Sequence, residues 1–171
     1  AFGYKALRYN TTGQYNTSVG RYSLLNNTTG GNNTALGVNT LINNTTGSRN
    51  TAVGMESLYY NNVGNNNSAF GQQALINNTT GGNNTAVGLN SLLSNVVGNR
   101  NNAFGVYALR NNTTNNNNAF GYFALTSNTT GTNNSAFGHY ALRNNTIGIN
   151  SAAFGYRALR LNITGNRNTA V

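Results

Sequence analysis

The stretch N-T-A-L-G-V-N-T-L-I-N-N-T-T-G-S-R covers residues 33–49, and N-T-A-V-G-M-E-S-L-Y-Y-N-N-V-G-N-N follows directly over residues 50–66. A glycine returns with the same seventeen-residue period along the whole chain, with a single sixteen-residue step. These glycines are Gly3, Gly20, Gly37, Gly54, Gly71, Gly88, Gly105, Gly121, Gly138 and Gly155. Self-similarity at a short fixed period is typical of a solenoid, in which each unit is stable only against its neighbours.

We number each repeat from the residue two before its glycine, so that Ala1 is position 1 and Thr17 is position 17. The consensus A-F/V-G-x-x-A/S-L-x-x-N-T-T-G-x-x-N-T predicts a strand over positions 16 to 3, a bend over 3 to 5, a second strand over 6 to 9 and a turn over 10 to 15. Helix is not expected, because apolar residues do not recur at helical spacing. We therefore predict an all-β parallel solenoid of ten coils, a single repeat domain over residues 1–171, roughly 48 Å long at about 4.8 Å a coil.

Two positions are predicted to form the core. Position 7 is leucine in every repeat, and position 2 is always Phe, Val or Leu. Stacked in register, these side chains form two continuous apolar ladders. The predicted core ladder consists of Leu7, Leu24, Leu41, Leu58, Leu75, Leu92, Leu109, Leu125, Leu142, Leu159, Phe2, Val19, Leu36, Val53, Phe70, Val87, Phe104, Phe120, Phe137 and Phe154.

Asparagine is the commonest residue, with 39 copies, and it recurs almost without exception at two positions of the repeat. Position 10 is always asparagine, and position 16 is asparagine except at Ser151. Stacked amides can hydrogen-bond along the axis, and asparagine tolerates left-handed backbone, so we assign both positions to corners of the coil. The predicted asparagine ladder is Asn10, Asn27, Asn44, Asn61, Asn78, Asn95, Asn112, Asn128, Asn145 and Asn162.

The residues at positions 2 and 6 vary together: Phe occurs with Ala, Val with Ser, and Leu36 with Thr40. Close packing of a large against a small side chain explains this, and so does block duplication of two repeat subtypes. Strict alternation along a strand would place positions 6 and 7 on opposite faces. Position 6 is then expected to face a neighbouring chain, and oligomerisation to bury the small residues of positions 1 and 6.

The chain carries ten basic residues and one acidic residue, for a formal charge of +9. Such an excess attracts nucleic acid, acidic polysaccharide or lipopolysaccharide. The charges are spread along the sequence, so the alternative is solvated charge that keeps a polar rod soluble. Aromatic residues at the bend could stack on sugars or bases. The candidate surface-binding residues are Arg8, Arg110, Arg143, Arg160, Tyr4, Tyr122, Tyr140 and Tyr156.

Catalytic and metal-binding side chains are scarce. Glu56 is the only side-chain carboxylate, His139 the only imidazole, and there is no cysteine. One chain therefore cannot assemble an acid/base pair, a triad or a metal cluster. We expect no enzymatic activity, no cofactor and no metal, and the absence of a long apolar run argues against a membrane span.

Three further readings stay open. Asn-x-Thr/Ser patterns such as Asn27-Thr28-Thr29 are surface glycosylation acceptors or turn chemistry that happens to match. Positions 11 and 12 form mostly threonine rows, interrupted by residues such as Val63 and Ile147, which makes an ice-binding solenoid a lesser alternative. A disordered, asparagine-rich prion-like tract is a third, against which the strict phase of the repeat argues.

The repeat resembles known arrays. Asn33–Gly37 and Asn50–Gly54, with the x-x-S/A-L and N-T-T-G elements, resemble the head repeats of trimeric autotransporter adhesins. They resemble more closely the N-T-A-x-G-x-x-A-L-x-x-N-T-T-G arrays of phage tail-fibre-like and bacterial surface proteins. The resemblance implies a left-handed parallel β-roll, usually homotrimeric, that acts as a rigid extracellular stalk or adhesive head.

The sequence therefore predicts a non-enzymatic structural protein of an extracellular fibre, stalk or adhesin, located outside the cell or on a cell or virion surface. Because the chain begins and ends inside the repeat, we expect a segment of a longer array or a filament subunit. The expected partner is the chain itself, as a trimer or an end-to-end filament. The alternative function is a binding module for polyanionic glycans or cell-surface polymers, through the arginines and tyrosines of the bend.

Overall fold

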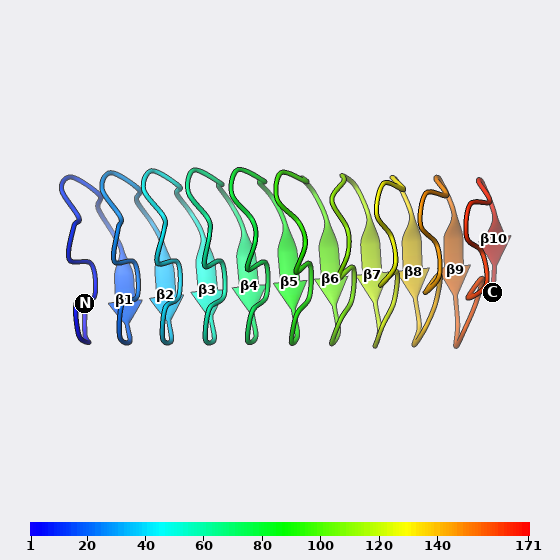
Figure 1. The fold of residues 1–171 in the computed structure, drawn as a ribbon, viewed down its shortest axis with the longest axis horizontal. Coiled ribbons are helices and arrows are strands. Elements are labelled where there is room, and N and C mark those ends of the chain that lie inside the picture. Colours follow the sequence, from blue (N-terminus) through cyan, green and yellow to red (C-terminus); the bar gives the residue numbers. More distant parts are fainter.

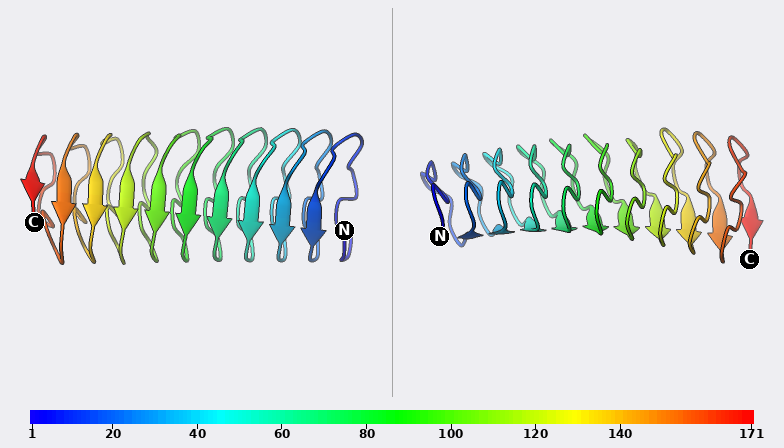
Figure 2. Two further views of the ribbon diagram at one scale, coloured as in Figure 1. Left: turned by 180° about the vertical axis from the view of Figure 1, so that it is seen from behind. Right: turned by 60° about the horizontal axis from the view of Figure 1, so that its bottom comes forward.

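The computed structural model describes residues 1–171 as a rod in which every repeat makes one coil with one short strand (Figure 1). The ten strands form one parallel sheet in sequence order, so the predicted all-β parallel solenoid is confirmed. Figure 2 shows the strands along one side of the rod and the turns along the other. The strands are β1 (Thr17–Val19), β2 (Thr34–Leu36), β3 (Thr51–Val53), β4 (Ser68–Phe70), β5 (Thr85–Val87), β6 (Asn102–Phe104), β7 (Asn118–Phe120), β8 (Ser135–Phe137), β9 (Ala152–Phe154) and β10 (Thr169–Ala170).

Equivalent residues stack directly on one another. Ala35 pairs with Ala52 between β2 and β3, and this register holds along the sheet. The sixteen-residue step changes nothing in the strands, because Ala103 still pairs with Ala119 between β6 and β7. The missing residue is therefore absorbed outside the sheet, as expected for a deletion in an exposed turn.

The strand covers only positions 17, 1 and 2, and the second strand expected over positions 6 to 9 does not form. The backbone there takes left-handed φ at positions 5 and 7, as at Tyr22 (59°) and Leu24 (48°). A left-handed residue cannot continue an extended strand. The segment still bonds to the next coil, since the Leu24 and Asn26 amides donate to the carbonyl oxygens of Thr40 (3.0 Å) and Ile42 (3.1 Å).

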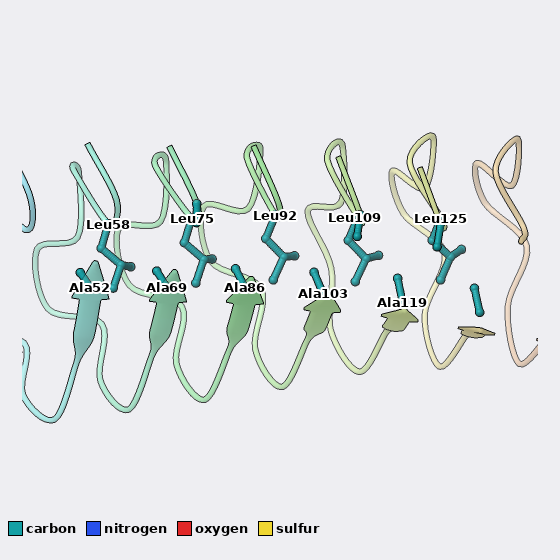
Figure 3. Packing of buried hydrophobic residues seen from close by; sticks show 14 of the residues in the cluster. Ala52, Leu58, Ala69, Leu75, Ala86, Leu92, Ala103, Leu109, Ala119 and Leu125 are labelled. Atoms are coloured by element: carbon teal, nitrogen blue, oxygen red, sulfur yellow. The ribbon is translucent and has the colours of Figure 1, made fainter. Parts of the chain in front are cut away.

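The core is a single leucine ladder that faces the small side chains of position 1 (Figure 3). Leu58 and Ala52, for example, have no exposed surface. The interior between the strand wall and the leucine wall is thin, so only a methyl or hydroxymethyl group fits opposite each leucine. Close packing thus selects alanine or serine at position 1.

The prediction that position 2 belongs to the core is wrong. Residues alternate along the short strand, so position 1 points inward and positions 17 and 2 point outward. Phe70, for instance, is 41% exposed. The corrected set, which lies on the outside of the sheet at half-buried or exposed positions, is Phe2, Val19, Leu36, Val53, Phe70, Val87, Phe104, Phe120, Phe137 and Phe154.

Position 6 does not face outward either. Ala74 and Leu75, at positions 6 and 7, are both fully buried, because the left-handed backbone at the leucine breaks the alternation expected of a strand. The small residues of positions 1 and 6 are thus covered within one chain and need no neighbour to bury them. In the one repeat where both are serine, the Ser18 and Ser23 hydroxyls form a hydrogen bond with each other. Close packing between positions 2 and 6 does not account for their covariation, since they lie on opposite sides of the strand wall.

The asparagines of position 10 form the predicted ladder. The Asn44 amide donates to Asn27 Oδ1 (2.7 Å), and the Asn61 amide donates in turn to Asn44 Oδ1 (2.8 Å). A second ladder runs through position 16, where Asn33 Oδ1 accepts the backbone N–H of Asn50 (3.0 Å). Both ladders are buried, and neither position has positive φ. The left-handed residues other than glycine are at positions 5, 7 and 15, so the asparagines of positions 10 and 16 are required for their hydrogen bonds rather than for a left-handed backbone.

Candidate anion-binding site

The side chains of positions 4, 5 and 8 share one surface of the rod, which we call the bend face. The left-handed residue at position 5 turns the chain, so that position 8 comes back alongside it. The Arg110 guanidinium lies 5.4 Å from the ring centre of Tyr107, and that of Arg143 lies 5.4 Å from the ring centre of Tyr140. Basic residues of position 8 are thereby held over aromatic residues of position 5.

The largest group of basic and aromatic side chains on the bend face comes from the eighth, ninth and tenth coils. A cavity of about 240 Å³ is lined there by Tyr122, Phe123, Tyr140, Arg143, Arg157 and Arg160, which we call the arginine pocket. Arg143 also lies 5.3 Å from the Phe123 ring centre, and Arg157 lies 5.9 Å from that of Tyr140. The rings pack along the axis, with 6.0 Å between the centres of Phe123 and Tyr140. The guanidiniums of Arg143 and Arg157 thus each lie against rings from two adjacent coils, whereas that of Arg160 has no such contact.

The arginine pocket contains no acidic side chain. The only side-chain carboxylate, that of Glu56, lies in the fourth repeat and accepts a hydrogen bond from Gln73 (2.9 Å). Arg160 Nε is buried and has no hydrogen-bond partner. A buried donor without a partner costs free energy, and the natural partner of a guanidinium is an oxyanion. The pocket can therefore bind a carboxylate, sulfate or phosphate group by charge-assisted hydrogen bonds.

A smaller cluster lies at the other end of the bend face. Lys5 Nζ lies 5.0 Å from the ring centre of Tyr4, and Arg21 lies 4.7 Å from that of Tyr22. The hydrogen bond from Arg21 to the Tyr22 hydroxyl (3.4 Å) lowers the pKa of that phenol, because the guanidinium favours the phenolate. Tyr4 and Arg21 are exposed, Lys5 and Tyr22 are half-buried, and the cluster encloses no cavity.

Between the two clusters the bend face is almost uncharged. Residues such as Asn39, Glu56, Gln73 and Asn90 occupy position 5 in the third to sixth repeats. The basic residues that make the charge look evenly spread along the sequence are Arg49, Arg100 and Arg167, and all three belong to position 15. Sorting the charges by position within the repeat would have revealed the clusters.

The structure brings only part of the predicted binding set together. Arg143, Arg160, Tyr122 and Tyr140 line the arginine pocket. Tyr156 lies beside it, with its ring centre 4.8 Å from the Arg157 guanidinium. Arg110 lies outside the pocket lining, over Tyr107. Arg8 and Tyr4 belong to the first coil, where Arg8 covers Tyr9.

Sequence reasoning missed Phe123 and Arg157 as members of the pocket. Both occupy position 5, one in the eighth repeat and one in the tenth. The sequence did contain a signal for them, because residues at the same position of successive repeats stack on one another. Position 5 is occupied in turn by Tyr107, Phe123, Tyr140 and Arg157.

A second surface runs along the outside of the sheet. We call positions 17 and 2 of the strands the outer sheet face. Four phenylalanines stack there with nearly parallel rings, and the ring centres of Phe104 and Phe120 are 4.6 Å apart. Phe137 and Phe154 continue the stack at 4.7 Å and 5.2 Å. The result is an apolar row on a flat parallel sheet.

Other sequence candidates find less support. The position 10 sequons are not surface acceptors, because amides such as that of Asn27 are buried in the ladder. In the threonine rows, the hydroxyls of Thr11 and Thr28 donate to the backbone carbonyls of the next coil, so they are already used within the chain. His139 is exposed, and no three His, Cys, Asp or Glu side chains are close enough to hold a metal ion. No helix with the length and apolarity needed to span a bilayer is present.

Comparison of the chain with models of protein families, with curated proteins and with solved structures finds no match.

Proposed function

We propose that this protein is a non-enzymatic structural rod of an extracellular fibre, stalk or adhesin, and that its chains associate along the outer sheet face. The observation that carries the proposal is the apolar row of position 2, which follows the sheet from Val19 to Phe154. Extended apolar surface on a soluble protein marks an interaction site. The small residues of position 17, such as Thr85 and Ser135, leave the row accessible to a flat partner.

The spacing of the row favours a second copy of the same chain. A partner must present an apolar group once per coil, about every 4.8 Å, over nearly the whole rod. Another copy of this solenoid has that spacing by construction. The resemblance of the repeat to autotransporter heads and tail-fibre-like arrays supports the same role. A trimer is the assembly that would use the outer sheet face, whereas an end-to-end filament would pair the terminal strands instead.

Sedimentation equilibrium of the chain tests this proposal. We expect an oligomer that dissociates when Phe104 and Phe137 are both replaced by threonine. In the matched control, threonine replaces Val38 and Met55. These two side chains are similarly exposed, at 43% and 44%, but lie on the bend face. A wild-type chain that is monomeric at high concentration, or a control pair that dissociates equally, would rule out the outer sheet face as the interface.

A second candidate function is a binding module for polyanionic glycans or cell-surface polymers. It is supported by the two clusters of basic and aromatic side chains on the bend face and by the formal charge of +9. Salt-dependent retention on a heparin column is the expected result, because polyanion binding releases counterions. Passage of the chain through the column at low salt would remove this candidate.

A further inference from the structure

We infer that the arginine pocket is a discrete site for one oxyanion group carried on a saccharide, of the kind found in sulfated or phosphorylated polysaccharides. The inference deepens the second candidate function and rests on it. It differs from that candidate in assigning the binding to three arginines of two adjacent coils rather than to the charge of the whole rod.

The first support is the aromatic contacts of two of the three guanidinium groups. Arg143 is held between Phe123 and Tyr140, and Arg157 between Tyr140 and Tyr156. Side chains that are held in place before binding lose less conformational entropy when the ligand arrives. Arginines such as Arg49, which has no aromatic contact, lack this preorganisation.

The second support is unused hydrogen-bonding capacity. Arg160 Nε is buried without an acceptor, and no carboxylate is near enough to neutralise any of the three guanidiniums. An arriving oxyanion would accept hydrogen bonds from the guanidinium nitrogens that line the cavity. Planar guanidinium groups bind sulfate, phosphate and carboxylate oxygens in pairs of parallel bonds, which makes arginine better suited than lysine here.

The third support concerns the kind of molecule that carries the anion. Arg143 lies over Phe123 and Tyr140, so these two rings are less open to the base stacking that single-stranded nucleic acid requires than the exposed Tyr156 beside the pocket. The cavity of about 240 Å³ is smaller than typical drug-sized sites of roughly 300–1,000 Å³, and Arg157 and Arg160 also line an adjoining open hollow of about 550 Å³. A single charged substituent of a sugar chain fits the smaller cavity better than a nucleotide does.

Isothermal titration calorimetry with a heparin-derived tetrasaccharide tests the inference. We expect Arg143→Gln and Arg160→Gln each to weaken binding by about tenfold, equivalent to about 1.4 kcal/mol. Arg49→Gln removes the same charge outside the pocket and should change affinity less than about twofold. Arg143→Lys should fall between, since it keeps the charge but loses the paired bonds. Unchanged melting temperatures would show that the variants are folded.

Further titrations separate the possible sources of the anion. Glucose 6-sulfate and glucose 6-phosphate should bind weakly and compete with the tetrasaccharide, whereas glucose should not. The relative strength of the two esters then identifies the preferred oxyanion.

Three results would overturn the site. If Arg49→Gln weakens binding as much as Arg160→Gln, the polyanion function stands but the discrete pocket does not. If oligo(dT) binds as tightly and with the same dependence on Arg143 and Arg160, the ligand is a nucleic acid. If the wild-type chain binds neither the tetrasaccharide nor the heparin column, the inference and the second candidate function fail together.

Discussion

The side-chain amide of Asn112 donates to the carbonyl oxygen of Thr114 (2.9 Å), and Asn95, one coil earlier, keeps a buried Oδ1 that accepts no hydrogen bond. This is the one broken rung of the position 10 ladder. It occurs in the sixteen-residue repeat, where Thr114 takes the place of the turn glycine. The ladder resumes at once, since the Asn128 amide donates to Asn112 Oδ1 (2.7 Å).

Restoring the missing residue should stabilise the rod. A glycine inserted between Thr114 and Asn115 recreates the N-T-T-G turn and lets Asn112 reach Asn95. Satisfying a buried acceptor is worth about 1–3 kcal/mol, and each kcal/mol raises the melting temperature by about 2–4 °C in a chain of this size. Calorimetry measures the shift. A glycine inserted after Gly131, where the turn is complete, should give no increase, and a similar rise there would contradict the explanation.

The cost of losing a ladder asparagine should depend on its rung. Asn78 donates to Asn61 Oδ1 (2.8 Å) and accepts from Asn95 (3.0 Å), whereas Asn95 donates but does not accept. Asn78→Ala should therefore cost about 0.5–1.5 kcal/mol more than Asn95→Ala, which is the contribution of one hydrogen bond. Denaturant unfolding compares the two variants. Equal costs would mean that the missing rung has no energetic consequence.

The recurring glycine of position 3 should not tolerate a side chain. Gly71 has φ of 132°, and a Cβ there would lie 2.8 Å from the carbonyl oxygen of Gly88 in the next coil. Both strain and collision with backbone oppose it, so Gly71→Ala should cost at least about 2 kcal/mol. Gly82→Ala is the control, because its Cβ would meet its nearest atom at 3.1 Å. Thermal unfolding should rank Gly82→Ala as much the milder change; the reverse order would refute the close approach of the coils.

The position of the phenylalanines can be tested within a single coil. Leu142 is fully buried, and Phe137 is 37% exposed on β8. Leu142→Ala should destabilise the chain by about 2–5 kcal/mol through the cavity that it leaves. Phe137→Ala should cost about 1 kcal/mol or less in unassociated chains, mainly through lost ring stacking. Unfolding is measured at a concentration where the chain is monomeric, and a larger loss for Phe137→Ala would place position 2 in the core after all.

The repeat predicts which residues stack on one another, but it does not predict which way each side chain points within a coil. The leucine and asparagine ladders could be read directly, because identical residues at a fixed period stack on one another whatever the shape of the coil. The placement of Phe120 outside and Ala124 inside could not. Phe120 lies outside because alternation along β7 turns Ala119 inward. Ala124 lies inside because of the left-handed backbone at Leu125, which is unusual for a leucine and cannot be recognised in a hydrophobic pattern.

The arginine pocket was likewise predictable from the sequence only in part. The sequence contained the arginines and tyrosines, and their spacing of three residues was visible in Tyr140 and Arg143. That this spacing brings a ring beneath a guanidinium depends on the bend at position 5.

By itself, the sequence determined that this chain is a column of like units, since a constant period lets every residue meet its own kind one coil away. The tertiary structure alone decided which side chains are enclosed and which charges are neighbours. The reason is that a few left-handed residues set the direction of each side chain within a coil, and that direction follows from the path of the backbone rather than from the order of residues.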